Sequence, residues 1–433
     1  MREFGLFING EYCDAASGET FASINPATGE AVAAVAKGGA EDVTRACDAA
    51  QAAFEGEWGA MTCDERGAII AGAADLIEER AEEFAQLETL DVGKPITEAR
   101  AIDVPAAVGY LRWYATVTDT PVGETIDIPS AAQIDYSLYQ PYGVVAGIAP
   151  WNFPLFLGAL KIGPALAVGN AAIIKPASIT SMTTLACCEC FADAGLPAGA
   201  LNVIAGPGGT VGEAMVTDPR VQKVFFTGST EVGRRVIELS ARNITNVSAE
   251  LGGKSPMVVF ADADLDQAVA GAVFGLLLNN GQNCIAGTRL LVERRVYDEV
   301  CAAVADKLAS LVLGDPMDEA TQLGAIVSQE QFEKVTGYIA LGRDEGATVA
   351  CGGEVPVIPG CEDGWFVEPT LLTGCTNDMR VVREEIFGPV LVAVPFEDEA
   401  DAVRLANDSP YGLGSAVFTR DADRIARMVR ALQ

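Results

Sequence analysis

The sequence predicts an α/β protein with two domains, and three observations support this fold class. The chain has 433 residues, which exceeds the size at which a single hydrophobic core usually stops growing. Half of the residues are hydrophobic, yet Gly, Pro or a charged residue interrupts each apolar run before it could span a bilayer. From residue 136 onward, short β-branched runs alternate with helical stretches, an order typical of a parallel sheet with helices on its faces.

The predicted elements fall into two sets along the chain. Apolar residues recur at helical spacing in 40–54 and 64–90, with acidic residues between them, which predicts surface helices. The alternation that follows predicts four strands, each followed by a helix. The strands are at 144–148, 171–174, 200–204 and 224–226, and the helices that follow them are at 155–167, 183–194, 210–216 and 231–239. The second set consists of a strand at 257–260, a helix at 265–278, a strand at 289–292, a helix at 297–311, a Gly/Pro-rich segment at 352–364 and a last α/β stretch.

The net charge and the cysteines of the chain indicate which binding partners and which cellular compartment to expect. A formal net charge of −31 argues against a nucleic-acid or anionic-membrane partner, because such surfaces require clustered Lys and Arg. An acidic excess of this size is also typical of a surface adapted to high salt. The N-terminus lacks the apolar stretch of a signal peptide, and eleven cysteines in so long a chain fit free thiols in a reducing compartment. We therefore expect a cytoplasmic protein.

Two short segments, 249–256 (AELGGKSP) and 281–284 (GQNC), predict the chemistry. The chain has no histidine, so the base on which most Cys and Ser hydrolases rely is missing. A cysteine that attacks carbon and a glutamate on a glycine-rich turn that activates water could divide the work, which makes Cys284 and Glu250 the candidates. Taken alone, each has a plainer interpretation as a core thiol and a solvated charge. The neighbouring glycines permit close backbone approach, and a domain boundary at Gly252 and Gly253 would place the pair on opposite walls of an interdomain cleft.

Glycine-rich turns provide candidate phosphate sites. In segment 225–233 (FFTGSTEVG) a strand ends in a glycine turn that opens a helix, where free N–H groups attract phosphate. The G-x-G-x-x-G fingerprint is absent, so an ordinary N-cap by Ser229 is an equal alternative. The loop 206–209 (GPGG) could admit a ligand, although a tight turn is favoured there. No metal site is predicted, because Cys187, Cys188 and Cys190 lack a second pair at zinc spacing.

Seven motifs in order along the chain carry a family resemblance. They are 150–154 (PWNFP), 175–177 (KPA), 226–230 (FTGST), 250–254 (ELGGK), 281–284 (GQNC), 384–389 (EEIFGP) and 411–413 (YGL). Together they resemble the aldehyde dehydrogenase superfamily, in its hydrolytic, NAD(P)-dependent type. The resemblance implies a Rossmann-like NAD(P)-binding domain of residues 1–122 and 142–252, a small oligomerisation arm of residues 123–141 and a second α/β catalytic domain of residues 253–433.

The resemblance also implies a reaction, the oxidation of an aldehyde to a carboxylic acid with NAD or NADP. Cys284 would add to the aldehyde carbon, and the side-chain amide of Asn152 with the backbone N–H of Cys284 would hold the oxyanion. After hydride transfer, Glu250 would activate the water that hydrolyses the thioester, and Lys161 would relay protons. A helix N-terminus near the thiol and the cationic cofactor would lower the thiol pKa.

Further positions match cofactor contacts of the family. Lys175 would lie at the adenine ribose, Gly228 and Ser229 at the pyrophosphate, and Glu385 and Phe387 at the nicotinamide ribose. The remaining candidate cofactor contacts are Ile148, Trp151, Ser178, Gly208 and Leu251.

Two features depart from the family pattern. Many NAD-preferring members carry Glu three residues after the ribose lysine, where this chain has Ser178, which favours NADP or dual use. The chain stops at Gln433, before the usual closing segment, so the sequence predicts a C-terminal truncation. The usual partner strand of the arm would then be missing, and a homodimer or homotetramer is expected if the full C-terminus is present.

The substrate and two rival functions stay open at this point. Apolar residues would line the entry beside Asn283 and Ile285 and would suit an aliphatic or aromatic aldehyde, although a semialdehyde is possible; these residues are Phe153, Phe156, Leu157 and Leu160. One rival is a CoA-acylating (semi)aldehyde dehydrogenase, against which the presence of Glu250 argues. The other is a truncated, non-catalytic structural or binding homologue.

Overall fold

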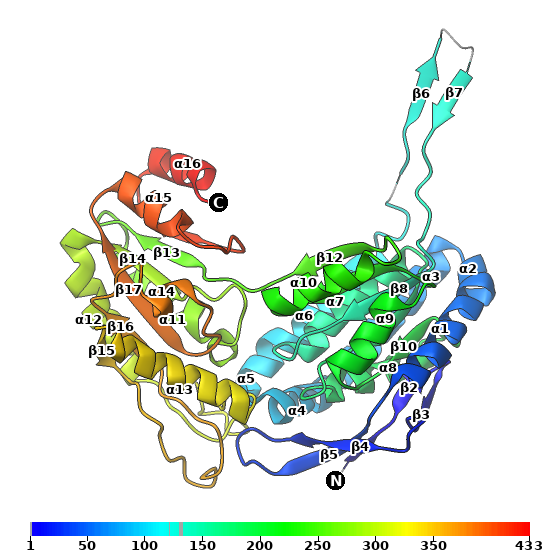
Figure 1. Ribbon diagram of the computed structural model, residues 1–433, viewed down its shortest axis with the longest axis horizontal. Coiled ribbons are helices and arrows are strands. Elements are labelled where there is room, and N and C mark those ends of the chain that lie inside the picture. The colour runs from blue at the N-terminus through cyan, green and yellow to red at the C-terminus, as the bar shows by residue number, and fades with distance from the viewer. Residues whose placement is uncertain (1, 121, 130–132) are drawn as a thin grey trace. The chain divides into compact units, whose positions relative to one another are not determined.

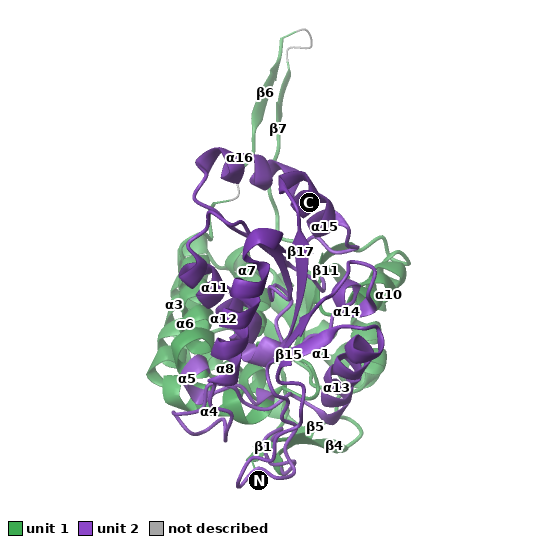
Figure 2. Ribbon diagram, turned by 90° about the vertical axis from the view of Figure 1, so that its left-hand side faces the viewer, with its two compact units in different colours: residues 1–24, 31–91, 99–250 green, residues 25–30, 92–98, 251–433 purple. Residues whose placement is uncertain are grey.

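The computed structural model describes residues 2–120, 122–129 and 133–433, and its chain divides into two compact units (Figure 2). Unit 1 consists of Met1–Ile24, Ala31–Asp91 and Ala99–Glu250, and unit 2 of Asn25–Glu30, Val92–Glu98 and Leu251–Gln433. Each is an α/β unit around its own large sheet (Figure 1). Among the described residues, none of the helices has the length and apolar character needed to cross a bilayer.

Unit 1 contains a seven-stranded sheet in the order β12-β11-β8-β9-β10-β2-β3. The strands are β12 Asn246–Glu250, β11 Val221–Thr227, β8 Val144–Ile148, β9 Ala171–Lys175, β10 Leu201–Val203, β2 Leu6–Ile8 and β3 Glu11–Cys13. The first five run parallel, as the alternating pattern predicts, while β2 and β3 add an antiparallel edge. A small sheet of β1 Arg2–Phe4, β5 Ala31–Ala36 and β4 Thr20–Ile24 completes the N-terminal part.

The strand order of this sheet reverses between β8 and β11. The chain proceeds from β8 to β9 and β10 on one side, and then returns to place β11 and β12 on the other side of β8. Such a switch point leaves a crevice beyond the carboxyl ends of the strands, where ligands of open α/β sheets bind. The register aligns these ends, because Ile148 pairs with Lys175 and with Phe226, while Thr227 pairs with Glu250.

Helices connect the strands of unit 1. They are α1 Ala40–Glu55, α2 Glu57–Ala60, α3 Cys63–Glu79, α4 Ala81–Val92, α6 Val104–Ala115, α7 Pro154–Ala167, α8 Met182–Asp193, α9 Glu213–Thr217 and α10 Thr230–Ser240. Helices α1 and α7 pack on β8 and β9, and α9 and α10 pack on β11. None of the eleven cysteines forms a disulfide, and Cys187, Cys188 and Cys190 on α8 are buried, as predicted.

The helical segment predicted at 64–90 differs from the structure in two ways. It is interrupted at Arg80, which caps α3 before α4 begins. Its second half is also not a surface helix, because Glu88 is fully buried, as is Asp91 just beyond the predicted segment. The Asp91 carboxylate accepts hydrogen bonds from Ser23 Oγ (2.5 Å) and from the Met182 backbone N–H (2.9 Å) at the start of α8. The two acids are therefore buried, and the spacing of acidic residues in the sequence does not reveal this.

The predicted arm contains an antiparallel pair of strands, β6 Thr125–Ile128 and β7 Gln133–Tyr136 (Figure 1). Its apolar side chains Ile126, Ile134 and Tyr136 are exposed. Residues 130–132 of the arm lie outside the described residues. The oligomerising role of this hairpin stays a prediction.

Unit 2 contains a six-stranded sheet in the order β15-β16-β17-β14-β13-β18. The strands are β15 Thr348–Cys351, β16 Thr370–Thr373, β17 Val390–Phe396, β14 Arg289–Glu293, β13 Pro256–Val259 and β18 Ala416–Phe418, all parallel except for β15. The helices are α5 Ile96–Glu98, α11 Leu265–Leu277, α12 Tyr297–Ala309, α13 Gln329–Asp344, α14 Arg380–Arg383, α15 Glu399–Asn407 and α16 Ala422–Ala431. Alternate strand residues face opposite sides, so Leu290 packs with α11 and α12 while Leu291 packs with α13 and α15.

Candidate active site

The carboxyl edge of the parallel sheet in unit 1 gathers several predicted site residues. Glu250 is the last residue of β12 and is exposed, rather than lying in a turn as the glycine-rich sequence suggested. Its backbone carbonyl accepts a hydrogen bond from the Gly228 N–H at 3.1 Å. This bond joins the end of β12 to the loop that follows β11.

Lys161 lies beneath the same edge. Its Nζ donates to Thr227 Oγ1 at 2.7 Å and lies 4.8 Å from the centre of the Phe225 ring. Burial lowers the pKa of Lys161 to about 8, and the charge of Glu250 acts in the opposite direction. Since Thr227 pairs with Glu250 in the sheet, the structure brings Lys161 and Glu250 to adjacent strand ends.

Asn152 and Trp151 follow β8, at the switch point of the sheet. Ile148 ends β8, and α7 begins only two residues after Asn152. Asn152 is 3 % exposed, and the Trp151 carbonyl accepts a hydrogen bond from Thr180 Oγ1 at 3.0 Å. The short connection between strand and helix therefore fixes the backbone that carries Asn152 at the carboxyl edge.

The predicted adenine-side residues also meet at this edge. Lys175 ends β9 and is buried, its Nζ donates to the Pro176 carbonyl at 2.8 Å, and burial lowers the pKa of the amine to about 8. The half-buried Ser178 donates to the Gly206 carbonyl at 2.7 Å. Gly208 is exposed at the start of a π-helical turn, Gly208–Gly212, and a Cβ at this glycine would meet no atom within 4 Å. The loop after β10 thus leaves space beside the strand ends.

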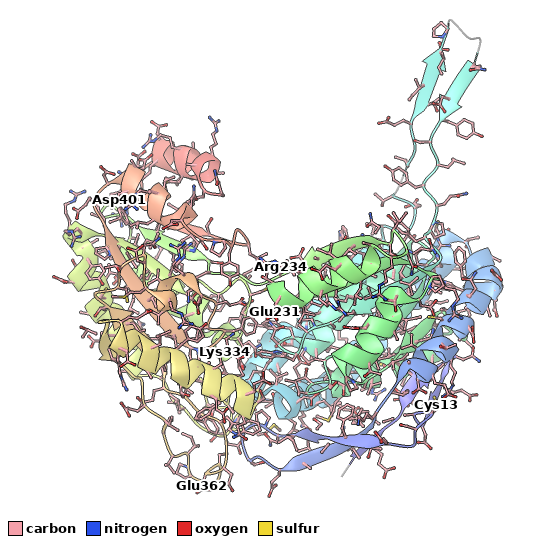
Figure 3. The ribbon with its side chains drawn as sticks, viewed as in Figure 1. Cys13, Glu231, Arg234, Lys334, Glu362 and Asp401 are labelled. Atoms are coloured by element: carbon pink, nitrogen blue, oxygen red, sulfur yellow. The ribbon has the colours of Figure 1, made fainter. Side chains whose placement is uncertain are left out.

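Ser229 performs the plainer of its two predicted roles. Its Oγ accepts a hydrogen bond from the Val232 N–H at 3.3 Å and caps α10. Glu231 and Arg234 lie in the first turns of this helix (Figure 3). A cap of this kind leaves other N–H groups of the first turn without intrahelical partners, so it is compatible with a phosphate site.

In unit 2, Cys284 lies on a loop whose backbone is held in unusual conformations. Helix α11 is followed by a 3₁₀ turn, Leu278–Gly281, in which Asn279 and Asn280 have φ of +55° and Gly281 has φ of +75°. Asn and Gly adopt such left-handed conformations more readily than other residues, which explains the Asn-Asn-Gly sequence before the cysteine. The partly exposed Cys284 thus follows the end of a helix, so the helix N-terminus expected near the thiol is not provided by its own segment.

Side-chain amides fix this loop to the rest of unit 2. Asn280 Nδ2 donates to the carbonyls of Gly93 (3.1 Å) and Ala325 (2.8 Å), and Asn280 Oδ1 accepts from the Gly324 N–H (2.9 Å). Buried side chains with several hydrogen bonds have little rotational freedom. The thiol that follows is therefore carried by a rigid support rather than by a free loop.

A two-glycine segment links the cysteine loop to Glu385. A Cβ at Gly253 would lie 2.4 Å from the Cys284 carbonyl oxygen, and a Cβ at Gly252 would lie 2.5 Å from Glu385 Oε2. The Gly253 N–H donates to Glu385 Oε1 at 2.9 Å. Only glycine permits both approaches, so the structure brings together the candidates Cys284 and Glu385, with the half-buried Leu251 two residues before Gly253.

Phe387 has a strained backbone with φ of +62°, which costs free energy in a residue with a bulky side chain and is frequent at functional sites. Gln331 stabilises it by donating from Nε2 to the carbonyls of Ile386 (3.0 Å) and Phe387 (2.7 Å). The segment that carries the two predicted nicotinamide-side residues is therefore tied to α13.

Comparison with known proteins identifies the family. Residues 12–433 match the family model described as the aldehyde dehydrogenase family. The chain belongs to the aldehyde dehydrogenase family. It is 40% identical over 430 residues to aldehyde dehydrogenase family 2 member C4 of Arabidopsis thaliana, covering 99% of this chain and 85% of that protein.

Solved structures of aldehyde dehydrogenases have the same fold. The NAD+ complex of aldehyde dehydrogenase from Bacillus cereus is 43% identical with a TM-score of 0.97, and covers 100% of this chain and 87% of that one. Indole-3-acetaldehyde dehydrogenase AldA of P. syringae, in complex with NAD+ and IAA, is 41% identical with a TM-score of 0.97, and covers 100% and 87%. The predicted α/β fold class is thereby confirmed. So are the family, the enzyme class with a small-molecule aldehyde as substrate, and the use of NAD or NADP.

Sequence reasoning missed residues that support this aldehyde dehydrogenase site from a distance. Gln331 and Thr227 bond to the site residues Phe387 and Lys161, which are remote in the sequence, and Asn280 fixes the cysteine loop to a remote carbonyl. The Asn-Asn-Gly run before Cys284 carried a local signal, since such residues favour positive φ. The partners of Gln331 and Thr227 depend on tertiary structure and left no such signal.

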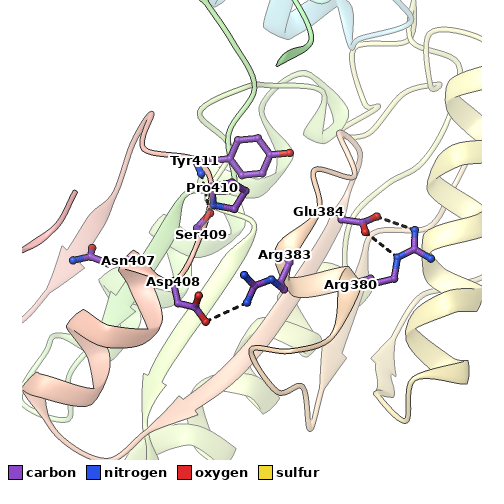
Figure 4. A pocket seen from close by; sticks show the side chains of 8 residues that line it. All are labelled: Arg380, Arg383, Glu384, Asn407, Asp408, Ser409, Pro410 and Tyr411. Atoms are coloured by element: carbon purple, nitrogen blue, oxygen red, sulfur yellow. Dashed lines mark hydrogen bonds and ion pairs between the residues drawn. The ribbon is translucent and has the colours of Figure 1, made fainter. Parts of the chain in front are cut away.

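A cavity of about 510 Å³ borders the segment before Glu385 in unit 2 (Figure 4). Tyr411, from the last predicted motif, lines it together with Arg380 and Arg383. Arg380 Nε donates to the Glu384 carboxylate at 2.8 Å and Arg383 Nη1 to the Asp408 carboxylate at 3.2 Å. The positive charge of both arginines is thus neutralised by acids, which makes this cavity a poor phosphate site.

Proposed function

We propose that this aldehyde dehydrogenase acts through a thioester on Cys284. The Cys284 sulfur forms a bond to the aldehyde carbon, and the carbonyl oxygen becomes an oxyanion that the Asn152 amide and the Cys284 N–H stabilise. The nicotinamide cofactor, when bound, supplies the hydride acceptor that turns this adduct into a thioester. Glu250 then takes a proton from water, the resulting hydroxide attacks the thioester, the carbon–sulfur bond breaks and the carboxylic acid leaves.

The observation that carries the proposal is the arrangement at the carboxyl edge of the sheet in unit 1. Glu250 ends β12 beside Thr227 at the end of β11, and Lys161 on α7 donates from Nζ to that threonine. A lysine whose burial lowers the pKa to about 8 can both release and accept a proton near neutral pH. It therefore suits a relay for the proton that Glu250 takes from water.

The residues on the cofactor side fit a dinucleotide. A lysine ammonium has three donors, and within the described part of the chain Lys175 uses one of them on the Pro176 carbonyl. The open side of Gly208 and the first turn of α10 behind Ser229 offer space and N–H groups for phosphates. These features support Lys175, Gly208 and Ser229 as the residues that would hold the cofactor.

We favour NADP or dual use over strict NAD use. Ser178 is neutral, so it does not repel a 2′-phosphate as a carboxylate there would. Two unit charges about 4 Å apart interact by roughly 1 to 4 kcal/mol, which corresponds to about fivefold or more in affinity. Ser178→Glu should therefore lower the ratio of NADP to NAD turnover by at least about fivefold. Strict NAD use by the unchanged enzyme would contradict the preference.

The substrate is proposed to be an aliphatic or aromatic aldehyde, with a semialdehyde as the alternative. Phe153 is buried and Phe156 is half-buried at the start of α7, one residue and four residues after Asn152. Indole-3-acetaldehyde, named for the P. syringae relative, supports the inclusion of arylacetaldehydes among the test substrates.

The eleven free thiols support a cytoplasmic location, and the exposed apolar hairpin of β6 and β7 supports assembly as a homodimer or homotetramer.

The experiment is a spectrophotometric assay with NAD or NADP and a panel of aldehydes. Cys284→Ala should abolish formation of reduced cofactor, whereas Cys13→Ala, a partly exposed thiol in unit 1 (Figure 3), should leave the rate unchanged. Turnover that requires added coenzyme A would favour the acylating alternative. Absence of turnover with every aldehyde, in a folded protein that binds the cofactor, would favour a non-catalytic homologue.

A further inference from the structure

Lys254 is a buried lysine to which the reaction above assigns no role. Its side chain is 2 % exposed, and within the described part of the chain its Nζ has no hydrogen-bond partner. An unpaired amine in an apolar interior costs several kcal/mol. Folds rarely retain such a group unless its charge serves a neighbour.

The three consecutive residues 252–254 all serve Glu385. Gly252 leaves room for the carboxylate, which would lie 2.5 Å from a Cβ at that position, and Gly253 donates its N–H to Glu385 Oε1 at 2.9 Å. Lys254 adds a positive charge that favours the ionised form of Glu385. Space, a hydrogen bond and a charge thus come from one short segment.

The backbone of Lys254 is itself fixed. The buried Arg289 on β14 donates from Nε to the Lys254 carbonyl (2.7 Å), from Nη1 to the Leu405 carbonyl (3.0 Å) and from Nη2 to the Ala406 carbonyl (2.7 Å). A guanidinium that donates to three carbonyls holds them in a defined geometry. Lys254 therefore enters the interior from a fixed segment just before β13.

We propose that Lys254 is a positioning residue, whose buried ammonium keeps the Glu385 carboxylate ionised and in place to accept a hydrogen bond from a hydroxyl of the nicotinamide ribose. The inference rests on the proposed cofactor role of Glu385. It adds the reason why this half-buried carboxylate stays charged.

The charges around the pair determine its pH dependence. Burial raises the pKa of Glu385, while the Gly253 N–H, Lys334 and Lys254 act to lower it. Lys334 is exposed on α13 (Figure 3), so solvent screens its charge more than that of Lys254. Around Lys254, Arg289 and Lys334 disfavour the charged amine, and Glu385 and Cys375 favour it. Burial and these charges lower the pKa of Lys254 to about 7.

Removal of Lys254 should therefore let the pKa of Glu385 rise further. The carboxylate would take up a proton at a higher pH and would then lose an acceptor for the ribose. A permanently charged arginine at the same position should preserve the ionised carboxylate, because its guanidinium does not deprotonate in this range.

The test measures binding of NADPH and NADH by fluorescence between about pH 5.5 and 9, with the full chain and no aldehyde present. In Lys254→Met, affinity should fall about tenfold at the acid end and recover to within about twofold at pH 9, since a shift of one pKa unit is a factor of ten. Lys254→Arg should retain the unchanged profile, and Glu385→Gln should bind weakly without a pH-dependent acid limb. The double variant should match Glu385→Gln alone, because a residue that acts through another has no effect once that other is gone.

The positioning role would be overturned if the double variant lost cofactor affinity by the product of the two single losses. It would also be overturned if the affinity of Lys254→Met fell at the same acidic pH as that of the unchanged protein. Normal cofactor affinity in Glu385→Gln would overturn the proposed place of Glu385 as well, so the two failures are distinguishable. Should Lys254→Met not fold, Lys254→Gln replaces it, and circular dichroism verifies that each variant tested is native.

Discussion

Replacement of Gly281 by alanine should disrupt the support of Cys284 through two separate effects. Gly281 has φ of +75°, and a left-handed conformation costs a residue with a Cβ about 1–2 kcal/mol. The new Cβ would also lie 2.4 Å from the Gly388 carbonyl carbon and 2.6 Å from the Pro389 nitrogen. Backbone atoms cannot rotate away, so overpacking adds about 1–3 kcal/mol. The total expected loss of stability is roughly 2–5 kcal/mol.

Gly374→Ala is the matched control in the same unit. Gly374 has φ of +67°, and a Cβ there would meet no atom within 4 Å, so only the conformational cost of about 1–2 kcal/mol applies. Urea unfolding followed by circular dichroism gives the two midpoints, and steady-state kinetics gives kcat. Gly281→Ala should unfold at lower urea than Gly374→Ala and should also lose kcat. Equal midpoints, or an unchanged kcat in Gly281→Ala, would refute the reasoning.

Three further predictions concern other parts of the molecule. Burial raises the pKa of Asp91 from 3.8 to about 7, so its contribution to stability is complete below about pH 4 and is lost as the pH rises through about 7. The free energy of unfolding in urea should therefore depend less on pH in Asp91→Asn than in the unchanged protein. An equal pH dependence in the two proteins would contradict this prediction. With a net charge of −31, the melting temperature should rise from dilute to molar salt, and a flat or falling series in thermal scans would remove the high-salt hypothesis. The Cβ of Gly253→Ala would lie 2.4 Å from the Cys284 carbonyl oxygen, so this variant should lower kcat by about tenfold to a hundredfold. Gly337→Ala, in open space on α13, should leave kcat unchanged. Equal kcat values in the two variants would count against a rigid cysteine loop.

Local patterns predicted the central strands β8 to β11, β13 and β14 and the helices between them, but not β1 to β5, α6 or β12. The strands at 144–148 and 289–292 were visible because short apolar runs between turn residues are typical of buried parallel strands. Ser229 is an N-cap because a hydroxyl before a helix satisfies N–H groups of its own first turn. Both signals depend on residues within a few positions of one another.

The features that sequence reasoning missed depend on distant partners. Glu250 was expected in a turn, and its place at the end of β12 follows from pairing with Thr227 on β11. Glu88 was expected on a surface helix, and its burial follows from its position against α8, where Thr183 Oγ1 donates to Glu88 Oε2 at 3.0 Å. No local rule contains these pairings, since each bond joins residues that are far apart along the chain.

The central claim is that Cys284 carries the acyl group and Glu250 is needed to release it. Glu250→Gln should therefore produce about one equivalent of reduced cofactor per subunit in a rapid burst and then stall. Mass spectrometry of acid-quenched protein should find the acyl group on the peptide that contains Cys284. Steady turnover of Glu250→Gln at the unchanged rate, or an acyl group on a different residue, would contradict the account.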